Sequence, residues 1–243
     1  MKNIQKTNTY NKRLFSGNKI RSAFHYSRFR WIKNTLKKYS IEFTNIIELG
    51  CFDGKLLDYL PNFPEKYLGL DADWEGGLEL AKRKYKDKKN IKFSHIFNPE
   101  QINLKESEVF NLAVSMETFE HIPPHLVCPY LEKISKHLNG FFLITVPNEK
   151  GIFFLLKRLL KPKHNKNIDN LDFTICDIIN LTLGRTNYVK RSEHKGFDYD
   201  HLIYDIRKYF DVVSIQGYSF FNFMPNFLSF GVGIIAVSKT NSQ

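Results

Sequence analysis

The stretch Ile46-Ile47-Glu48-Leu49-Gly50-Cys51-Phe52-Asp53-Gly54 decides the fold of this chain, because an apolar run ends there in a carboxylate and a glycine turn. A second apolar run ends in the same way, at Leu68-Gly69-Leu70-Asp71. A helical pattern lies between the two runs, so the segment predicts a strand, a helix and a parallel strand. Ligands bind at the carboxyl ends of such strands, and we expect the site there.

The acidic residues of this segment indicate which nucleotide binds. Asp71 follows the glycine turn by about 20 residues, the spacing at which a carboxylate meets ribose hydroxyls. Glu48 and Asp53 would repel a pyrophosphate, but they suit a ligand that carries an ammonium and a sulfonium. The glycines are spaced as GxxxG, whereas dinucleotide binders have GxGxxG. These features favour S-adenosylmethionine over NAD or FAD as the cofactor.

Strand and helix patterns alternate along the chain, which predicts an α/β fold with a largely parallel sheet and helices on both faces. The uncharged run Val212–Ser238 is long enough to span a bilayer. Its polar residues, proline and glycines instead favour two strands joined by a loop. The other expected strands are 46–49, 67–70, 91–94, 110–115 and 141–146, and the expected helices are 20–39, 55–60, 75–85, 124–137 and 199–210.

The net charge of +11 is concentrated near the N-terminus. The first 41 residues hold eleven Lys and Arg and no acid, and the remaining chain is balanced. We therefore expect a basic arm and helix at 1–41 and one catalytic domain at 42–243, with a helical insertion or cap at 151–198. Such an arm can bind nucleic acid, an anionic membrane or an acidic substrate, or it can simply be solvated.

The three cysteines are odd in number and form no CxxC pair, which argues against a disulfide framework and a zinc site. No apolar signal-peptide core opens the chain. We therefore expect a cytoplasmic protein, with binding at the inner face of the membrane as an extension of that expectation.

Four segments in this order resemble the motifs of class I S-adenosylmethionine-dependent methyltransferases. They are ELGCFDG at 48–54, GLDA at 69–72, FNLAVSMETFEHIPP at 110–124 and FFLITVPNE at 141–149. The acid-rich SMETFEHIPP is most similar to the branch that contains the ubiquinone-biosynthetic O-methyltransferases. The resemblance covers about 45–150, and it implies a Rossmann-like sheet of seven mostly parallel strands with an antiparallel last strand and an insertion after strand five.

The resemblance also implies a cofactor site. Glu48 and Gly50 would lie near the methionine part and Asp71 on the ribose, although Asp71 as a helix cap is an alternative. Phe52 stands where glycine is frequent, and Asn98 replaces an Asp that often contacts the adenine. Asp53 as a helix N-cap is an equally good interpretation. The predicted cofactor contacts are Glu48, Gly50, Cys51, Asp53, Gly54, Asp71, Ala72, Asn98, Ser115 and Met116.

Glu117, Glu120 and His121 have i, i+3 and i+4 spacing, which predicts one shared helical face. His121 can take a proton from the acceptor, Glu120 and His121 can orient a ligand, or the cluster can bind a divalent metal. We favour His121 and Glu120 as catalytic residues without a metal. The loop from His194 to Asp198 either lines the acceptor pocket or is a plain turn.

These observations predict an S-adenosylmethionine-dependent methyltransferase that is O-directed and acts on a lipid-linked or glycan-type acceptor. The segment 151–166 is apolar and basic, so it is either a lid or a membrane contact through Phe153, Phe154 and Leu155. A soluble small-molecule methyltransferase is the first alternative. An RNA methyltransferase and a non-catalytic binding protein are less favoured, because no RNA-binding module is recognisable and the site acids are retained.

Overall fold

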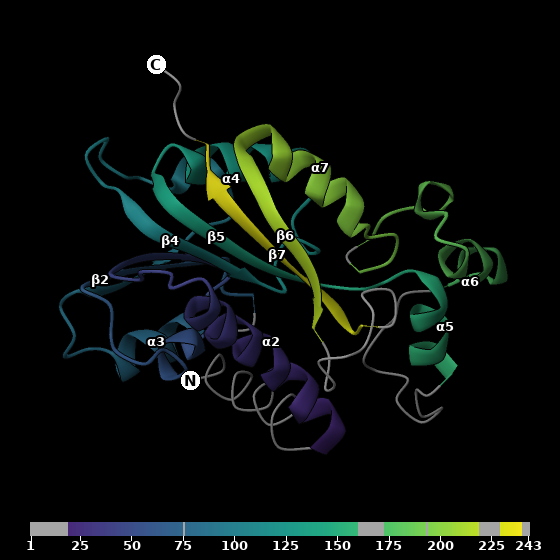
Figure 1. Cartoon of the computed structure of the whole chain (residues 1–243), viewed down its shortest axis with the longest axis horizontal. Helices are drawn as coiled ribbons and strands as arrows, with labels where there is room; N and C mark the ends of the chain where they lie inside the picture. The colour runs from purple at the N-terminus through teal and green to yellow at the C-terminus, as the bar shows by residue number, and fades with distance from the viewer. Residues whose placement is uncertain (1–18, 75, 160–172, 193, 219–228, 240–243) are drawn as a thin grey trace.

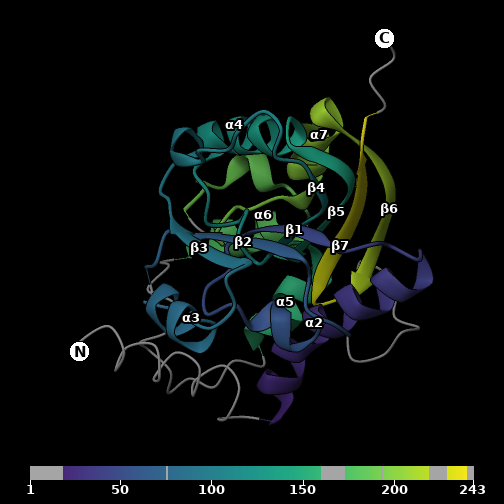
Figure 2. The same ribbon diagram turned by 90° about the vertical axis from the view of Figure 1, so that its left-hand side faces the viewer.

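The computed structural model describes residues 19–74, 76–159, 173–192, 194–218 and 229–239. Seven strands form one sheet in the order β3-β2-β1-β4-β5-β7-β6. Figure 1 shows the sheet from one side, and Figure 2 labels all of its strands. The strands are β1 (Asn45–Leu49), β2 (Lys66–Asp71), β3 (Ile91–His95), β4 (Phe110–Met116), β5 (Leu138–Pro147), β6 (Phe210–Tyr218) and β7 (Gly231–Ser238).

The direction of the strands confirms the predicted fold class. β1 to β5 pair in parallel, whereas β7 is antiparallel to both β5 and β6. β6 and β7 also confirm that the uncharged run forms two strands. None of the helices that the structure describes is long and apolar enough to cross a membrane.

Helices cover both faces of the sheet, as Figures 1 and 2 show. α2 and α3 lie on one face, and α4 and α7 lie on the other. The short 3₁₀ helices are η2 (Lys55–Asp58), η3 (Pro99–Gln101) and η4 (Thr186–Tyr188). The α-helices are α2 (Lys19–Lys38), α3 (Leu78–Lys84), α4 (Pro124–Ser135), α5 (Gly151–Leu159), α6 (Ile175–Thr182) and α7 (Tyr199–Tyr209).

Each face of the sheet has its own apolar core, because successive strand residues point to opposite sides. Ile47 and Leu49 belong to the core beneath α4 and α7, whereas Ile46 packs with α2 on the other side. The basic helix α2 therefore has a buried face, to which Phe29 and Ile32 contribute. The predicted arm is described only from Lys19 onward, and its first 18 residues lie outside the described part of the chain.

The insertion after β5 forms α5 and α6, which pack against each other at one end of the sheet. Phe154 of α5 packs with Leu181 of α6, and Phe153 is also buried. Residues 160–172 of the insertion and residues 219–228 of the loop before β7 lie outside the described residues.

Candidate active site

The carboxyl ends of β1, β2 and β4 meet at the glycine turn that follows β1. Gly50 has a φ of +79°, and its amide donates to the carbonyl of Leu70 at 2.7 Å. A Cβ atom on Gly50 would lie 2.0 Å from Oγ1 of Thr118, which follows β4. The same Thr118 hydroxyl donates to the carbonyl of Leu49 at 3.3 Å. Glycine is therefore required at this position, because the turn is packed directly against the loop after β4.

Phe52, which stands where glycine is frequent in the resembled family, has a backbone conformation that glycine favours. Its φ is +47°, in the left-handed region that side chains rarely occupy. Its amide donates to Oδ2 of Asp71 at 2.8 Å, and its ring lies within 3 Å of where a Cβ on Gly77 would stand. A phenylalanine at this position is therefore compatible with a turn whose amide reaches Asp71.

Backbone amides of the neighbouring loops fix the orientation of the Asp71 carboxylate. Its Oδ1 accepts from the amide of Asp73 at 2.7 Å, in addition to the Phe52 contact. Burial raises the pKa of Asp71, and the two amide hydrogen bonds oppose that shift. A carboxylate oxygen can accept more than one hydrogen bond, so both oxygens can still receive ribose hydroxyls. The capping alternative does not apply to Asp71, since Asp73 accepts from the amide of Leu78 at the start of α3.

Glu48 is buried beneath α2 at the end of β1. Its carboxyl accepts a short hydrogen bond from the hydroxyl of Tyr67. Burial raises the pKa of Glu48 to about 8, and the negative charges of Asp71 and Asp53 act in the same direction. The guanidinium of Arg28 on α2 opposes the shift. Glu48 is therefore ready to become an anion when a cationic group binds beside it.

Cys51, Gly54 and Asp53 are the other predicted cofactor contacts in the glycine turn, and they have different structural roles. Cys51 is a small buried residue, and its Sγ atom would lie 2.7 Å from a Cβ on Gly69. Gly54 forms the N-cap of η2 without any side-chain cap bond, so the structure does not support Asp53 as that cap.

The other predicted contacts lie at the ends of β2, β3 and β4. The carbonyl of Ala72 lies 3.1 Å from Nε2 of His95. Asn98 caps η3, where its side-chain oxygen accepts from the amide of Gln101. Ser115 and Met116 are buried at the end of β4.

The expectation that Glu117, Glu120 and His121 share one helical face is wrong. The residues after β4 form a tight turn, in which the amide of His121 donates to the carbonyl of Thr118 at 2.9 Å. Glu117 has a φ of +53° and accepts a short hydrogen bond from Tyr218 of β6. Glu117 is thereby directed to β6, while Glu120 and His121 remain together.

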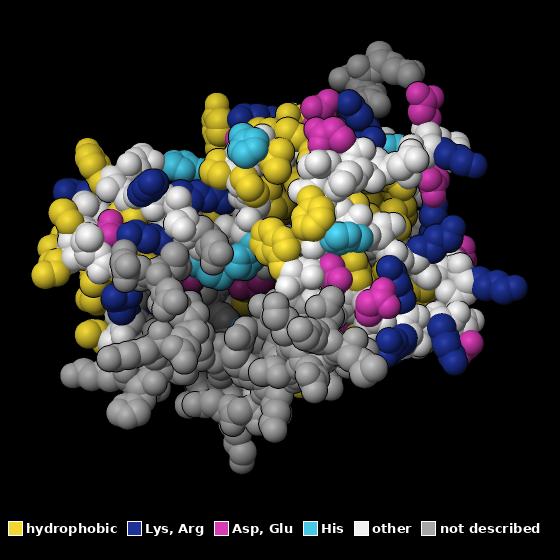
Figure 3. Space-filling model, turned by 180° about the vertical axis from the view of Figure 1, so that it is seen from behind, with side chains coloured by type: hydrophobic (Ala, Val, Ile, Leu, Met, Phe, Trp, Pro, Cys, Tyr) yellow, Lys and Arg dark blue, Asp and Glu magenta, His cyan; other side chains and the backbone are white. Residues whose placement is uncertain are grey.

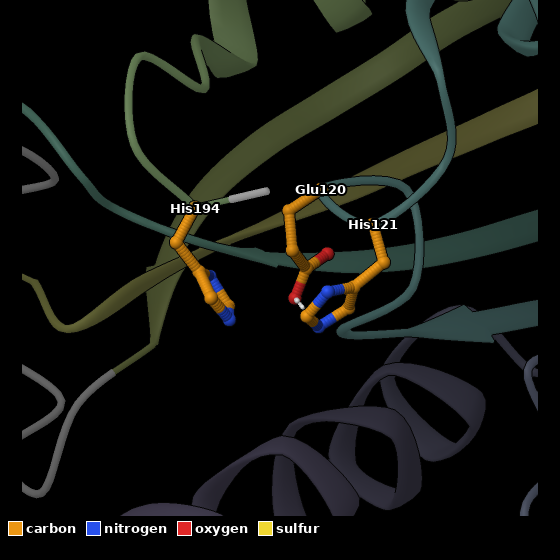
Figure 4. Close-up of side chains that lie close together, drawn as sticks. All are labelled: Glu120, His121 and His194. Carbon is orange, nitrogen blue, oxygen red and sulfur yellow. Dashed lines mark ion pairs between the residues drawn. The ribbon is translucent and has the colours of Figure 1, made fainter. Parts of the chain in front are cut away.

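His194 joins Glu120 and His121 from a distant loop. One ligand-type atom of each residue lies within 4.8 Å of the others, and the three side chains point toward one space above α2 in Figure 4. Nε2 of His121 is 4.0 Å from Oε1 of Glu120, and the two imidazole centroids are 4.6 Å apart. Figure 3 shows histidine and acidic side chains beside a hollow in this face. The sequence flagged this loop but did not assign His194 to the cluster.

Burial controls the protonation of the cluster. It raises the pKa of Glu120 well above the usual range, and the negative charge of Glu117 adds to the shift. Burial, together with neighbouring His194, lowers the pKa of His121 to about 4. His121 is therefore neutral at physiological pH, with a ring nitrogen able to accept a proton or bind a cation. Its low pKa makes it a weaker general base than an imidazole that titrates near pH 7.

Polar contacts hold the His194 loop against the rest of the site. Arg191 donates to the carbonyls of Phe119 and Ile122 at 3.3 and 3.1 Å, which joins this loop to the turn after β4. Lys150, after β5, forms a short ion pair with Asp198. These long-range contacts position His194, and nothing in the local sequence predicts them.

Trp74 and Arg28 are further site residues that the sequence reasoning missed. The exposed indole of Trp74 meets the ring of His121 edge-on, with centroids 6.4 Å apart. A tryptophan three residues after Asp71, the predicted ribose acid, is a signal that could have identified it. Arg28 was expected in the arm, but its charge acts on Glu48 and Glu120.

Comparison with known proteins gives the same result at the level of family and fold. A family model described as a methyltransferase domain matches residues 20–201. No curated protein matches the sequence significantly. An S-adenosylmethionine-dependent methyltransferase from Clostridium acetobutylicum is 11% identical, with a TM-score of 0.64 and coverage of 98% of this chain and 99% of its own.

Two further solved structures share the fold. A TehB-like S-adenosylmethionine-dependent methyltransferase from Corynebacterium glutamicum is 14% identical, with a TM-score of 0.59 and 98% of each chain covered. The N-methyltransferase NodS from Bradyrhizobium japonicum, in complex with S-adenosyl-L-homocysteine, is 13% identical, with a TM-score of 0.55; 97% of this chain and 100% of NodS are covered.

Proposed function

We propose that this chain, which belongs to the methyltransferase-domain family, is an O-methyltransferase. Its acceptor would be a hydroxyl oxygen of a lipid-linked or glycan-type molecule at a membrane surface. The enzyme is an S-adenosylmethionine-dependent methyltransferase, and S-adenosylmethionine is its cofactor. What we propose beyond this is that the methylated atom is an oxygen, that the acceptor is lipid-linked or of glycan type, and that the reaction takes place at a membrane. The resemblance of SMETFEHIPP to the ubiquinone-biosynthetic O-methyltransferases supports the choice of oxygen.

The residues at the carboxyl ends of β1 and β2 fit this cofactor. When bound, it supplies a methyl group already activated on a sulfonium centre. Asp71 would accept hydrogen bonds from the ribose hydroxyls, and its orientation is set by the amides of Phe52 and Asp73. Glu48, buried and beside Tyr67, would bind the methionine ammonium. An ammonium there would compensate the burial of this carboxylate.

The protein contributes mainly by orientation and by removal of a proton. Correct alignment of two reactants supplies up to roughly 7–11 kcal/mol of the barrier, whereas a general base adds about 10²–10⁴-fold in rate. Glu120 and His121 lie on the acceptor side, at the turn after β4. We assign to them the hydroxyl proton and the placement of the acceptor oxygen.

Two exposed apolar stripes carry the membrane part of the proposal. Ile152, Leu156 and Leu159 are exposed at i, i+4 and i+7 of α5. Ile175, Ile179 and Leu183 are exposed at i, i+4 and i+8 from the start of α6 onward, and Ile175 reaches 79% exposure. Hydrophobic side chains gather at the left edge of Figure 3, where α5 and α6 lie.

Apolar surface of this kind is typical of a binding face rather than of a solvated helix. Lys157 and Arg158 lie in the last turn of α5, and basic side chains beside an apolar face favour anionic lipid. We therefore propose peripheral association with the inner face of the membrane, with the acceptor presented there. Nucleic acid is not part of this proposal.

The residues first expected to enter the membrane are not the exposed ones. Phe153 packs against Phe230 with ring centroids 4.7 Å apart, and Phe154 packs against Phe173 at 5.7 Å. The prediction that Phe153 and Phe154 form the contact is wrong, since both lie in the core of the insertion. The stripe beside them, which begins with Ile152, is the surface available to lipid.

Sedimentation with anionic vesicles tests the membrane part. Wild-type protein should sediment at low salt, and Ile152→Ser with Leu156→Ser and Leu159→Ser should abolish sedimentation. Val213→Ser, at an exposed apolar residue of β6, is the matched control and should sediment as wild type. Wild-type protein that stays in the supernatant would point to a soluble acceptor and to a lid.

The acceptor itself is tested by mass spectrometry of lipid extracts after incubation with isotopically labelled cofactor. The label should appear as an O-methyl group in the lipid fraction. A labelled N-methyl group, or a label confined to the aqueous fraction, would contradict the proposed acceptor.

A further inference from the structure

We propose that Glu120, His121 and His194 bind one divalent first-row transition metal ion, such as Zn²⁺ or Mn²⁺, with a coordination position left for the acceptor oxygen. Binding of the ion is inferred from the geometry of these three side chains and does not depend on the identity of the acceptor. The role given to the ion in catalysis rests on the proposed function above.

The spacing of the three side chains fits a metal centre. Their ligand-type atoms lie within 4.8 Å of one another. Bonds of about 2.0–2.2 Å to nitrogen and oxygen place two ligand atoms about 3.4 Å apart in a tetrahedral site. Side-chain rotations of less than about 1 Å would therefore close the cluster around one ion. Figure 4 shows the carboxylate and both imidazoles directed toward a common point.

Glu120 provides an independent indication that a cation belongs here. Its side chain has no exposed surface, and neither carboxylate oxygen has a hydrogen-bond partner among the residues that the structure describes. A buried polar group without a partner is costly, and native proteins rarely leave one so. A bound metal ion would satisfy both the charge and the lone pairs of this carboxylate.

Glu149 lies beside Nδ1 of His194 but accepts no hydrogen bond from it among the residues that the structure describes. Its Oε1 is 3.9 Å from Nδ1 of His194 and accepts from Nζ of Lys157 at 2.5 Å. A ligating histidine commonly donates its second ring N–H to a carboxylate, which fixes the ring. A small movement that brings Nδ1 of His194 onto Glu149 would leave Nε2 of His194 for the ion, and Nε2 of His121 already lies 4.0 Å from Glu120.

The donor set selects the class of ion. Two imidazoles and one carboxylate suit Zn²⁺, Mn²⁺ and related transition metals, and they are a poor match for Ca²⁺, which prefers oxygen ligands. Three protein ligands leave at least one position open, as in catalytic rather than structural metal sites. Both histidine side chains are about one-third exposed, so the cluster is open to solvent on one side and a further ligand can reach the ion.

An ion at this position would activate the acceptor hydroxyl by lowering its pKa. Because His121 and Glu120 would then hold the ion and would no longer take the proton themselves, the hydroxyl proton passes to water, and the oxygen lone pair forms the new bond to the methyl carbon. The bond between that carbon and sulfur breaks, and its electron pair stays on sulfur as a neutral thioether. Charge is conserved, because the sulfonium loses its positive charge as the proton is released.

Cobalt(II) is the probe for the site, since its visible absorption reports bound ligands directly. Tag-free full-length protein with S-adenosylhomocysteine should bind one Co²⁺ per chain, and Zn²⁺ should displace it. His194→Ala, His121→Ala and Glu120→Gln should each weaken Co²⁺ binding at least tenfold. His125→Ala, at an exposed histidine of α4, should bind Co²⁺ as wild type does.

The outcomes separate this inference from the proposed function. Absence of saturable Co²⁺ binding in the wild type, or wild-type affinity in His194→Ala, overturns the metal site whatever the acceptor is. Metal binding with no O-methylated lipid in the labelled extract leaves the site standing and removes the acceptor. If Glu120→Gln fails to fold, His194→Ala still decides, because its side chain is partly exposed on a loop.

Discussion

The amide of Phe52 donates to Oδ2 of Asp71 at 2.8 Å, so the turn after β1 holds the acid at the end of β2. The bond forms because Phe52 adopts a φ of +47°. A backbone conformation that most side chains avoid is thus used to orient the proposed ribose carboxylate before any ligand binds. The cofactor site is organised by contacts between neighbouring strand ends, and substitutions can test each contact.

Asp71→Ala should weaken binding of both S-adenosylmethionine and S-adenosylhomocysteine. Each charge-assisted hydrogen bond to the ribose contributes about 1.5–3 kcal/mol, which corresponds to a loss of at least tenfold in affinity. Calorimetry on the folded variant measures it, with the exposed Asp87→Ala as a control of equal charge change. Unchanged affinity would remove Asp71 from the site. NAD should not compete, because Asp53 in the glycine turn opposes its phosphates.

Glu48 should make the cofactor-free protein less stable as the pH rises. Its folded-state pKa of about 8 lies above its ordinary value of 4.5, so the folded state holds the extra proton between these pH values. The contribution of Glu48 to stability is therefore present below about pH 4.5 and is lost as the pH rises through 8.

Glu48→Gln should remove that part of the pH dependence and raise the melting temperature above pH 8. Thermal unfolding from pH 5 to 9 measures the effect. The same variant should bind S-adenosylmethionine more weakly, because the methionine ammonium loses its carboxylate partner. A melting curve with the wild-type pH dependence would show that Glu48 is ionised in the free protein.

Gly50→Ala should destabilise the fold and abolish cofactor binding. The new methyl group would lie 2.0 Å from Oγ1 of Thr118, and overpacking of this kind costs typically about 1–3 kcal/mol beyond the cost of the positive φ. Gly184→Ala is the matched control, because its φ is +72° and no atom lies within 4 Å of its Cβ position. Urea unfolding of both variants separates backbone strain from the clash, and equal losses would refute the clash.

His121→Ala should lower turnover by about 10²–10⁴-fold and leave S-adenosylhomocysteine affinity nearly unchanged. The reason is its position on the acceptor side of the site, 4.0 Å from Glu120. Steady-state kinetics and calorimetry on the same preparation give the two values. Full activity would reduce His121 to a packing role, whereas a parallel loss of cofactor affinity would move it to the cofactor side.

The framework of the fold followed from the sequence because its signals are local. The apolar run before Glu48, the glycine turn and the second run before Asp71 form one βαβ unit whose geometry leaves little choice. Parallel strands bring their carboxyl ends to one edge, so the proximity of these two acids was predictable. The ends of the helices were harder to predict than the proximity of these acids. The helix predicted at 55–60, for example, is the shorter 3₁₀ helix Lys55–Asp58.

In the insertion, the spacing of apolar residues predicts a helix but does not predict which side of that helix is buried. The pattern of α5 indicates apolar residues around most of the helix, but it does not say which of them a neighbour covers. Contact with α6 and with Phe230 buries Phe153 and Phe154, which leaves Ile152 and Leu156 outside. Which face is exposed depends on an element that arrives later in the chain.

By itself, the sequence determined the sheet, the glycine turn and the acids at the ends of β1 and β2, because residues close together in the chain dictate those features. Only the tertiary structure decided which side chains surround Glu120 and His121. It turned Glu117 toward Tyr218 and brought His194 to Glu120 and His121. Those pairings depend on how loops from different crossovers pack at the sheet edge, and no local pattern of residues encodes that packing.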